Sequence, residues 1–197
     1  ALSVLSDDSV AHVGVARHKI GRSRSEGHEP PVCTDRTFIA CSAGRLNASF
    51  NCVDRHLETL GDRTAIIWAQ DEVGAYRHIS YRELKHQVCR VANVLLAHGI
   101  KRGDRVCIYM GMMPELVYTM LACARIGAVH SVVFGGFSAE SLRDRIVDAR
   151  CRMVVTANEG LRGGKRIPLK KTVDKAAVDV NKAMQQGQGS ERLKEND

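Results

Sequence analysis

Three short apolar segments alternate with two helical segments from residue 105 onward, and this alternation constrains the fold more than any other feature of the sequence. Strands are predicted at 105–110 (RVCIYM), 128–134 (AVHSVVF) and 152–157 (RMVVTA). Pro114 opens the first intervening helix, and Ser138 caps the second. Strands joined through helices run parallel, so the pattern predicts an α/β fold with helices packed on a parallel sheet.

A second group of elements precedes this unit. Residues 51–61 predict a helix, and residues 64–68 and 76–80 predict the two strands of a β-hairpin. The next helix has the clearest signal in the chain, because Ser80 and Glu83 form an S-x-x-E capping box. Its apolar face is predicted from residues at helical spacing, namely Leu84, Val88, Val91, Ala92 and Leu95.

The ends of the chain lack this periodicity. Residues 1–43 are polar with paired prolines, and we expect them to be irregular. Residues 44–178 contain all the predicted elements, including a last helix from Pro168 to about Val178. Residues 179–197 have few large apolar side chains, and we expect them to form a polar tail.

The amino-acid composition argues against two functional classes, membrane proteins and metal-binding proteins. The chain has 197 residues, of which 44% are hydrophobic and 26% charged, as in ordinary globular proteins. No stretch approaches the ~20 apolar residues that span a bilayer, so no membrane partner is expected. The seven cysteines are odd in number and include no C-x-x-C pair. This pattern favours reduced thiols in a cytoplasmic protein and predicts no metal site.

Basic charge is concentrated near the C-terminal end. The formal net charge is +7, from 29 basic and 22 acidic residues. Residues 162–175 contain a single acid, Asp174, against six basic residues, which are Arg162, Lys165, Arg166, Lys170, Lys171 and Lys175. Aromatic residues make up only 5% of the chain, which leaves little for stacking on bases. A nucleic-acid partner is therefore not expected.

The segment EGLRGGKRIPLKK (159–171) is the strongest candidate for a binding site. It follows a predicted strand, and ligands of parallel sheets bind beyond the carboxyl ends of the strands. Its glycines let backbone N–H groups approach an anion, to which Arg162 and Lys165 can add charge-assisted hydrogen bonds. Its spacing does not fit a Walker A loop, because three residues separate Gly160 from Gly164. The alternative is a solvated basic loop without a ligand.

The segment FGGFS (134–138) is a second candidate. It joins a predicted strand to a helix N-terminus, where backbone N–H groups attract anions. The alternative is a tight turn in which the glycines only relieve crowding. The histidines are scattered without the spacing of a triad or a metal site, so we predict no catalytic residue.

Several runs together resemble the AMP-forming acetyl-CoA synthetases, which belong to the adenylate-forming acyl-CoA synthetases. The resemblance extends from about residue 44 to 178, and its most specific stretch is CARIGAVHSVVFGGFS (123–138). It implies that the sheet belongs to the incomplete N-terminal domain of an adenylate-forming enzyme. It also implies the reaction of these enzymes, in which acetate and ATP give acetyl-adenylate and pyrophosphate, and CoA then gives acetyl-CoA and AMP.

The resemblance also implies ligands and residues. CoA, ATP with Mg²⁺, and acetate are the expected small molecules. The CoA-binding residues carried over by position are Arg162, Gly163, Gly164 and Lys165. Related enzymes often have Arg where this chain has Lys165, and Lys keeps the charge without the bidentate fork. Arg166 leaves two alternatives open. In one, Arg166 partly compensates for the missing fork; in the other, the alignment of the loop with the family shifts by one residue.

Other family elements have no counterpart in the 197 residues. These elements are the ATP-phosphate loop, the acetate-pocket and adenine-contacting segments, and the C-terminal domain with its catalytic lysine. We therefore expect an N-terminal piece of such an enzyme that does not activate acetate by itself. The alternative function is a stand-alone phosphate- or CoA-binding module without catalysis.

Overall fold

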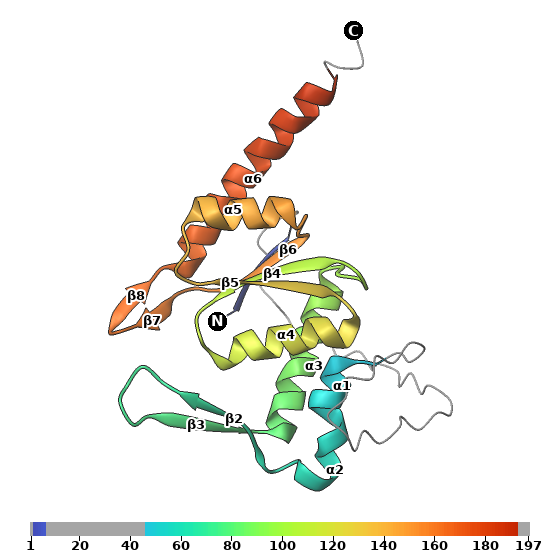
Figure 1. Ribbon diagram of the computed structural model, residues 1–197, viewed down its shortest axis with the longest axis vertical. Helices are drawn as coiled ribbons and strands as arrows, with labels where there is room; N and C mark the ends of the chain where they lie inside the picture. Colours follow the sequence, from blue (N-terminus) through green and yellow to red (C-terminus); the bar gives the residue numbers. More distant parts are fainter. Residues whose placement is uncertain (1, 7–45, 193–197) are drawn as a thin grey trace, which may run out of the picture.

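A computed structural model describes residues 2–6 and 46–192 of the chain. Its centre is a four-stranded sheet with the strand order β1-β6-β4-β5 (Figure 1). The strands are β1 (Leu2–Ser6), β4 (Arg105–Met110), β5 (Val129–Phe134) and β6 (Met153–Ala157). Strand β4 pairs in parallel with both β5 and β6, which confirms the predicted parallel α/β sheet.

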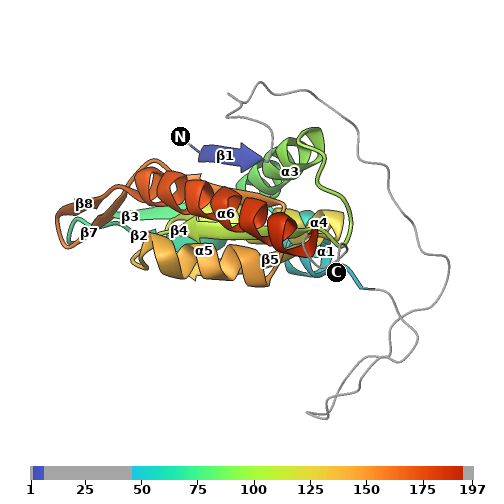
Figure 2. The same cartoon turned by 90° about the horizontal axis from the view of Figure 1, so that it is seen from above.

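Helices cover both faces of this sheet. Helix α4 (Pro114–Ile126) lies on one face, and α5 (Ala139–Asp148) lies on the other, beside α6 (Leu169–Arg192) (Figures 1 and 2). Strands β5 and β6 flank β4 on opposite sides, so the chain leaves β4 and β5 toward opposite faces of the sheet. Such a divergence opens the carboxyl edge of a parallel sheet to ligands.

The side chains of β4 alternate between two cores. Val106, Ile108 and Met110 pack into the core that α4 and α3 (Tyr81–Ala97) cover. Cys107 and Tyr109 point to the other face and pack with α5 and α6. All five side chains are buried, as expected for a central strand with helices on both faces.

The helix starts follow the signals in the sequence. The Ser80 hydroxyl accepts a hydrogen bond from the Glu83 backbone N–H at 3.2 Å, which confirms one half of the capping box. The Glu83 carboxylate instead accepts a hydrogen bond from Arg77 at 2.5 Å. The Ser138 hydroxyl caps α5 in the same way, by accepting from the Ser141 N–H at 3.3 Å.

The helix predicted at residues 51–61 is divided into shorter pieces. It comprises α1 (Ala48–Cys52), a 3₁₀ turn η1 (Asp54–His56) and α2 (Leu57–Leu60). Val53 breaks the helix at φ −127°. The next residue, Asp54, forms ion pairs with Arg125 on α4 and Lys85 on α3. These ion pairs connect the break in the predicted helix to α3 and α4, and they favour the interruption at this position.

A separate hairpin forms where the sequence predicted one. Strand β2 (Thr64–Ala69) pairs antiparallel with β3 (Tyr76–Ser80). The indole N–H of Trp68 donates a hydrogen bond to the Met112 carbonyl at 3.0 Å. This bond links the hairpin to the loop that follows β4.

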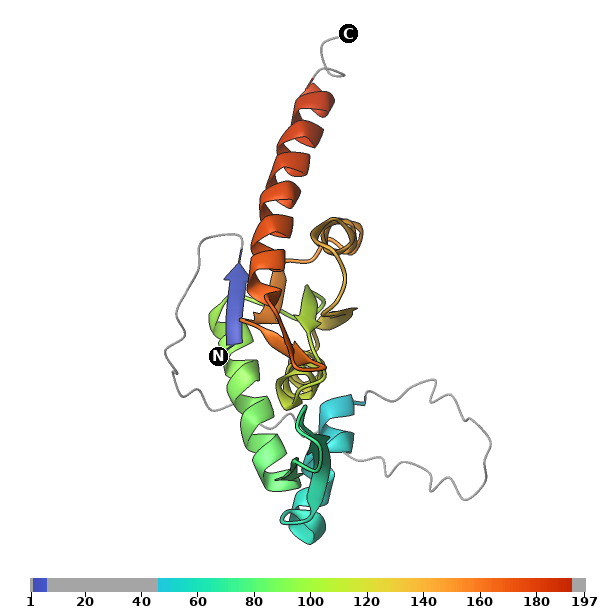
Figure 3. The ribbon, with the colours of Figure 1, turned by 90° about the vertical axis from the view of Figure 1, so that its left-hand side faces the viewer.

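The two ends differ from expectation. Irregular structure was expected for residues 1–43, but Leu2–Ser6 pairs antiparallel with β6 as an edge strand; the rest of that segment lies outside the described residues. A polar tail was expected from residue 179, but α6 continues to Arg192 and projects from the body of the molecule (Figure 3). Helix α6 packs against the core through its buried residues Leu169, Val173 and Val180. The polar residues that follow Val180 are mostly good helix formers.

Candidate functional site

The glycine-rich segment forms a β-hairpin rather than the expected loop. Strand β7 (Gly160–Arg162) pairs antiparallel with β8 (Lys165–Ile167). Gly163 and Gly164 form the two-residue turn between them, with φ values of +56° and +72°. Positive φ at both positions is typical of the tight turn that matches strand twist, and glycine adopts it without steric cost.

Two cations flank this turn. Arg162 pairs with Lys165 across the hairpin, so both side chains leave from the same face. Both are exposed, and neither forms an ion pair with any residue that the structure describes. Like charges at directly opposite positions of a hairpin repel each other. An anion bound between them would remove that repulsion.

Arg166 does not share this face. It is adjacent to Lys165 in the strand, so its side chain points to the opposite side of the hairpin. There it forms an ion pair with Glu159. Arg166 therefore does not replace Lys165 beside the turn, and the register of the hairpin selects Arg162 and Lys165 as the flanking pair.

The second candidate segment lies next to the hairpin. The Arg162 guanidinium lies over the ring of Phe134, 5.4 Å from its centroid. The N-terminus of α5, which follows this segment, already forms hydrogen bonds with side chains of the protein. Ser138 caps it, and the pKa of Glu140 is lowered to about 2 by a hydrogen bond from Lys175, by its own backbone N–H and by Ser138. These contacts favour the interpretation of residues 134–138 as a tight turn.

Close packing at two glycines fixes the root of the hairpin. A Cβ on Gly135 would lie 3.0 Å from the Met110 carbonyl oxygen and 3.1 Å from Leu169 Cδ2. A Cβ on Gly160 would lie 3.4 Å from Leu169 Cδ1. Leu169 is the first residue of α6 and is buried. The glycines thus let Leu169 pack against the carboxyl edge of the sheet and hold the hairpin there.

Asp71 contacts the turn, and sequence reasoning did not predict it. The β2–β3 turn lies on the same side of the molecule as the β7–β8 turn (Figure 1). From there, the Asp71 carboxylate accepts hydrogen bonds from Gly163 N–H at 3.3 Å and from Gly164 N–H at 3.0 Å. The two backbone groups expected to bind a phosphate therefore hold a carboxylate of the protein. No local pattern links residues so far apart in the sequence.

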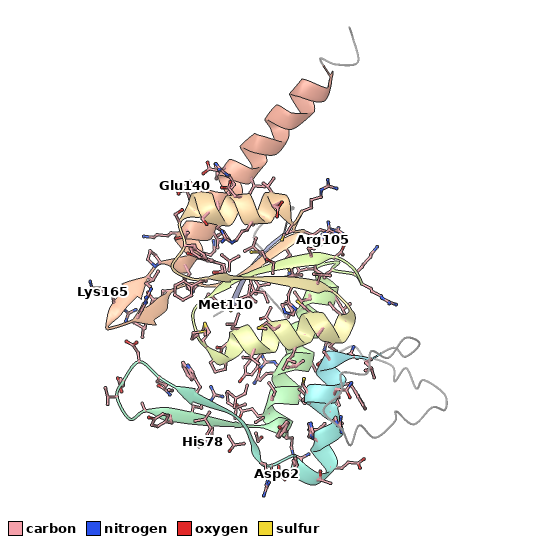
Figure 4. The ribbon with its side chains drawn as sticks, viewed as in Figure 1. Asp62, His78, Arg105, Met110, Glu140 and Lys165 are labelled. Atoms are coloured by element: carbon pink, nitrogen blue, oxygen red, sulfur yellow. The ribbon has the colours of Figure 1, made fainter. Side chains whose placement is uncertain are left out.

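The remaining basic residues of this segment are mostly paired. Lys170 binds Asp174 at 2.7 Å, and Lys175 binds Glu140 at 2.9 Å. Among the described residues, the cations of this segment without an ion pair are Arg162, Lys165 and Lys171. Lys165 lies at the outer end of the hairpin in Figure 4. The free positive charge is thus concentrated at the turn and the start of α6.

Residues 2–6 and 46–192 lack two further classes of site. That part of the chain contains no group of three or more His, Cys, Asp or Glu side chains that could hold a metal ion. It also contains no helix long and apolar enough to cross a membrane. Its five cysteines are free thiols, and burial raises the pKa of Cys123 to about 12.

The sequence model of the AMP-binding enzyme family matches residues 53–196. The chain belongs to the AMP-binding enzyme family. The resemblance to adenylate-forming enzymes is therefore confirmed. The matched region starts later than residue 44 and continues beyond residue 178, the limits expected from the sequence.

Curated relatives in this family are similar over most of the chain. Acetyl-coenzyme A synthetase 2 of Pseudomonas aeruginosa is 64% identical over 136 residues, which are 69% of this chain and 21% of the relative. Acetyl-coenzyme A synthetase of Halorhodospira halophila is 63% identical over 133 residues, 68% of this chain and 21% of its own length. Acetyl-coenzyme A synthetase of Salmonella typhi is 60% identical over 138 residues, which are 70% of this chain and 21% of the relative. This chain spans about a fifth of the length of these relatives.

Proposed function

We propose that this chain provides a contact for a CoA phosphate in an acetate–CoA ligase. In that activity, acetate, ATP and CoA give acetyl-CoA, AMP and pyrophosphate. The observation that supports the contact is the exposed pair Arg162 and Lys165, which flanks a turn with two backbone donors. The support for the activity is the identity of 60% or more to proteins named acetyl-coenzyme A synthetase.

The proposed contact has a simple chemical basis. A phosphate monoester carries up to two negative charges and three acceptor oxygens. Arg162 can donate two parallel hydrogen bonds to it, Lys165 adds a compact charge, and Gly163 and Gly164 offer backbone N–H donors. The hairpin would act in the second half of the reaction by holding CoA while its thiol attacks the acetyl-adenylate.

ATP, Mg²⁺ and acetate belong to the proposed reaction, but we assign them no residue among those described. We propose that the 197-residue chain binds CoA without activating acetate. A cytoplasmic location, where CoA and ATP are available, is part of the same proposal. Acetate-dependent release of pyrophosphate by the purified chain measures this directly, and turnover by the chain alone would contradict it.

The binding proposal is tested by calorimetric titration with CoA and with dephospho-CoA, which lacks the 3′-phosphate. We expect tighter binding of CoA, and we expect Arg162→Ala to reduce that preference by about tenfold, the effect of losing about 1.4 kcal/mol of charge-assisted hydrogen bonding. Lys165→Ala should act in the same direction. Lys165→Arg should retain the preference, because it keeps the charge and adds the fork.

Lys171→Ala is the matched control. Lys171 is an exposed basic residue without an ion pair among the described residues, and it lies on α6 outside the hairpin. Its replacement removes the same charge and should leave the preference for CoA nearly unchanged. Equal binding of CoA and dephospho-CoA by the unmodified chain would refute the proposed phosphate contact.

A further inference from the structure

We infer that Asp71 is an internal competitor for the anion site, so that a phosphate reaches the Gly163–Gly164 turn only when the Asp71 carboxylate leaves it. The inference rests on the proposed function in one respect, the identity of the incoming anion as a CoA phosphate. The geometric part is independent of it. The two carboxylate oxygens of Asp71 accept from two successive backbone N–H groups at 3.3 and 3.0 Å.

The contact uses the donors of the turn but leaves its cations free. Asp71 forms no ion pair with Arg162 or Lys165, although both flank the turn that it binds. A carboxylate there supplies one negative charge and satisfies the two backbone groups. The cross-strand pair of cations keeps its positive field, which still attracts a second anion.

The contact is also suited to exchange. Asp71, Gly163 and Gly164 are all exposed, so water can replace each hydrogen bond as it breaks. A phosphate that binds the same two N–H groups must displace Asp71, and the two negative groups repel each other at this distance. The measured affinity for phosphate is then reduced by the fraction of molecules in which Asp71 occupies the turn.

Displacement of Asp71 would release one hairpin tip from another. The strands of the β2–β3 hairpin are held elsewhere: near the turn, Trp68 donates to the Met112 carbonyl, and at the base the Tyr81 N–H donates to the Arg63 carbonyl at 3.1 Å. Only the turn around Asp71 depends on the contact with Gly163 and Gly164. Anion binding is therefore expected to free the turn at residues 70–75 and leave the two strands in place.

The test compares Asp71→Asn and Asp71→Ala with Glu72→Gln. Glu72 is the adjacent exposed acid, and its side chain has no hydrogen bond or ion pair among the described residues. Its replacement therefore controls for the loss of one negative charge. The first probe is inorganic phosphate, titrated into the chain while the Gly163 and Gly164 amide resonances are followed by NMR. We expect both Asp71 variants to bind phosphate about 3- to 10-fold more tightly, as an occupancy of about 70–90% by Asp71 implies.

Amide hydrogen exchange provides the second readout. Without ligand, the Gly163 and Gly164 amides should exchange faster in Asp71→Ala than in the unmodified chain, and Glu72→Gln should leave them unchanged. Unchanged exchange in Asp71→Ala would overturn the inference, because the contact would not exist in solution. Phosphate affinity that stays the same or falls in both Asp71 variants would overturn it as well, because Asp71 would then not compete. A gain in Glu72→Gln equal to that in Asp71→Ala would also overturn it.

The CoA titration separates this inference from the proposed function. If Asp71→Ala binds inorganic phosphate more tightly while CoA and dephospho-CoA bind equally, the competitor role is supported and the CoA assignment fails. If CoA is preferred and Asp71→Ala does not increase its affinity, the CoA assignment is supported and the competitor role fails. Both are supported if Asp71→Ala increases CoA affinity by the same 3- to 10-fold factor while dephospho-CoA affinity changes little.

Discussion

Leu169 joins the candidate site to the core. It is only 1% exposed, and it packs where Gly135 and Gly160 leave room for its two methyl groups. One residue thus fixes the start of α6, the end of the hairpin and the turn after β5. The position of the Gly163–Gly164 turn depends on this packing.

Leu169→Ala should lower the free energy of unfolding by about 2–5 kcal/mol, because it removes a buried side chain and leaves a cavity between elements that are fixed by the sheet. Urea denaturation followed by circular dichroism measures the change. Val178→Ala is the control in the same helix, since Val178 is 54% exposed. Its effect should stay within about 0.5 kcal/mol. A small effect of Leu169→Ala would show that the site closes around the smaller side chain.

Individual site residues could be predicted from the sequence only in part. The residues of the segment predicted Arg162 and Lys165 as anion contacts, and the resemblance to a family assigned the anion to CoA. The register of the hairpin adds that the two side chains lie on one face. Asp71 was missed because its role depends on the meeting of two distant turns, for which the sequence contains no local signal. Arg166 was left with two alternative roles, and only its pairing with Glu159 decides between them.

An ion pair links the two helices on one face of the sheet. Lys175 on α6 donates to Glu140 in the first turn of α5 at 2.9 Å, and this hydrogen bond is the main reason that the pKa of Glu140 falls from 4.5 to about 2. A carboxyl group with a lowered pKa in the folded state stabilises the fold above its unfolded pKa. The contribution is complete above about pH 4.5 and is lost as the pH falls toward about 2.

Glu140→Gln should therefore be less stable than the unmodified chain at neutral pH, and the difference should disappear between about pH 4.5 and 2. The effect should be small, because both side chains are largely exposed. Thermal denaturation at a series of pH values measures it. Glu58→Gln, at an exposed acid without an ion pair among the described residues, should not show this pH dependence. A difference for Glu140→Gln that persists at pH 2 would exclude the ion pair as its cause.

Elements were predicted well where a local rule marks their ends. Ser80, Pro114 and Ser138 begin helices as expected, because capping and proline geometry are local properties. The β7–β8 hairpin was read as a loop, because its strands have three residues each and no apolar alternation. The extension of α6 was missed for a related reason, since a polar helix has no periodic apolar face.

At the scale of the whole molecule, the parallel sheet follows from the alternation of strands and helices. The order of the strands in the sheet does not follow from this alternation, because the sequence contains no signal for the side of β4 on which each later strand pairs. The antiparallel pairing of β1 with β6 was also missed, because it joins segments that lie about 150 residues apart in the chain. The parallel direction of β5 and β6 places the turns that follow them at the same edge of the sheet, and the strand order places them on the two sides of β4.

The strand order also leaves β5 at an edge. Among the described strands, β5 pairs only with β4, so its outer backbone groups have no partner in that part of the chain. Val129, Val132 and Phe134 are exposed along it, at 53%, 45% and 48%. The strand VHSVVF contains no Lys or Pro, the residues that commonly protect such edges from pairing with another molecule.

The chain should therefore associate with itself through β5 as its concentration rises, and Val132→Lys should weaken this association several-fold because it places a charge on the exposed edge. Sedimentation velocity over a range of concentrations measures the effect. Val178→Lys makes the same change at an exposed valine on α6 and should leave the association unchanged. If both variants weaken it equally, net charge rather than the β5 edge controls the association. If the unmodified chain stays monomeric at every concentration, the edge does not pair at all.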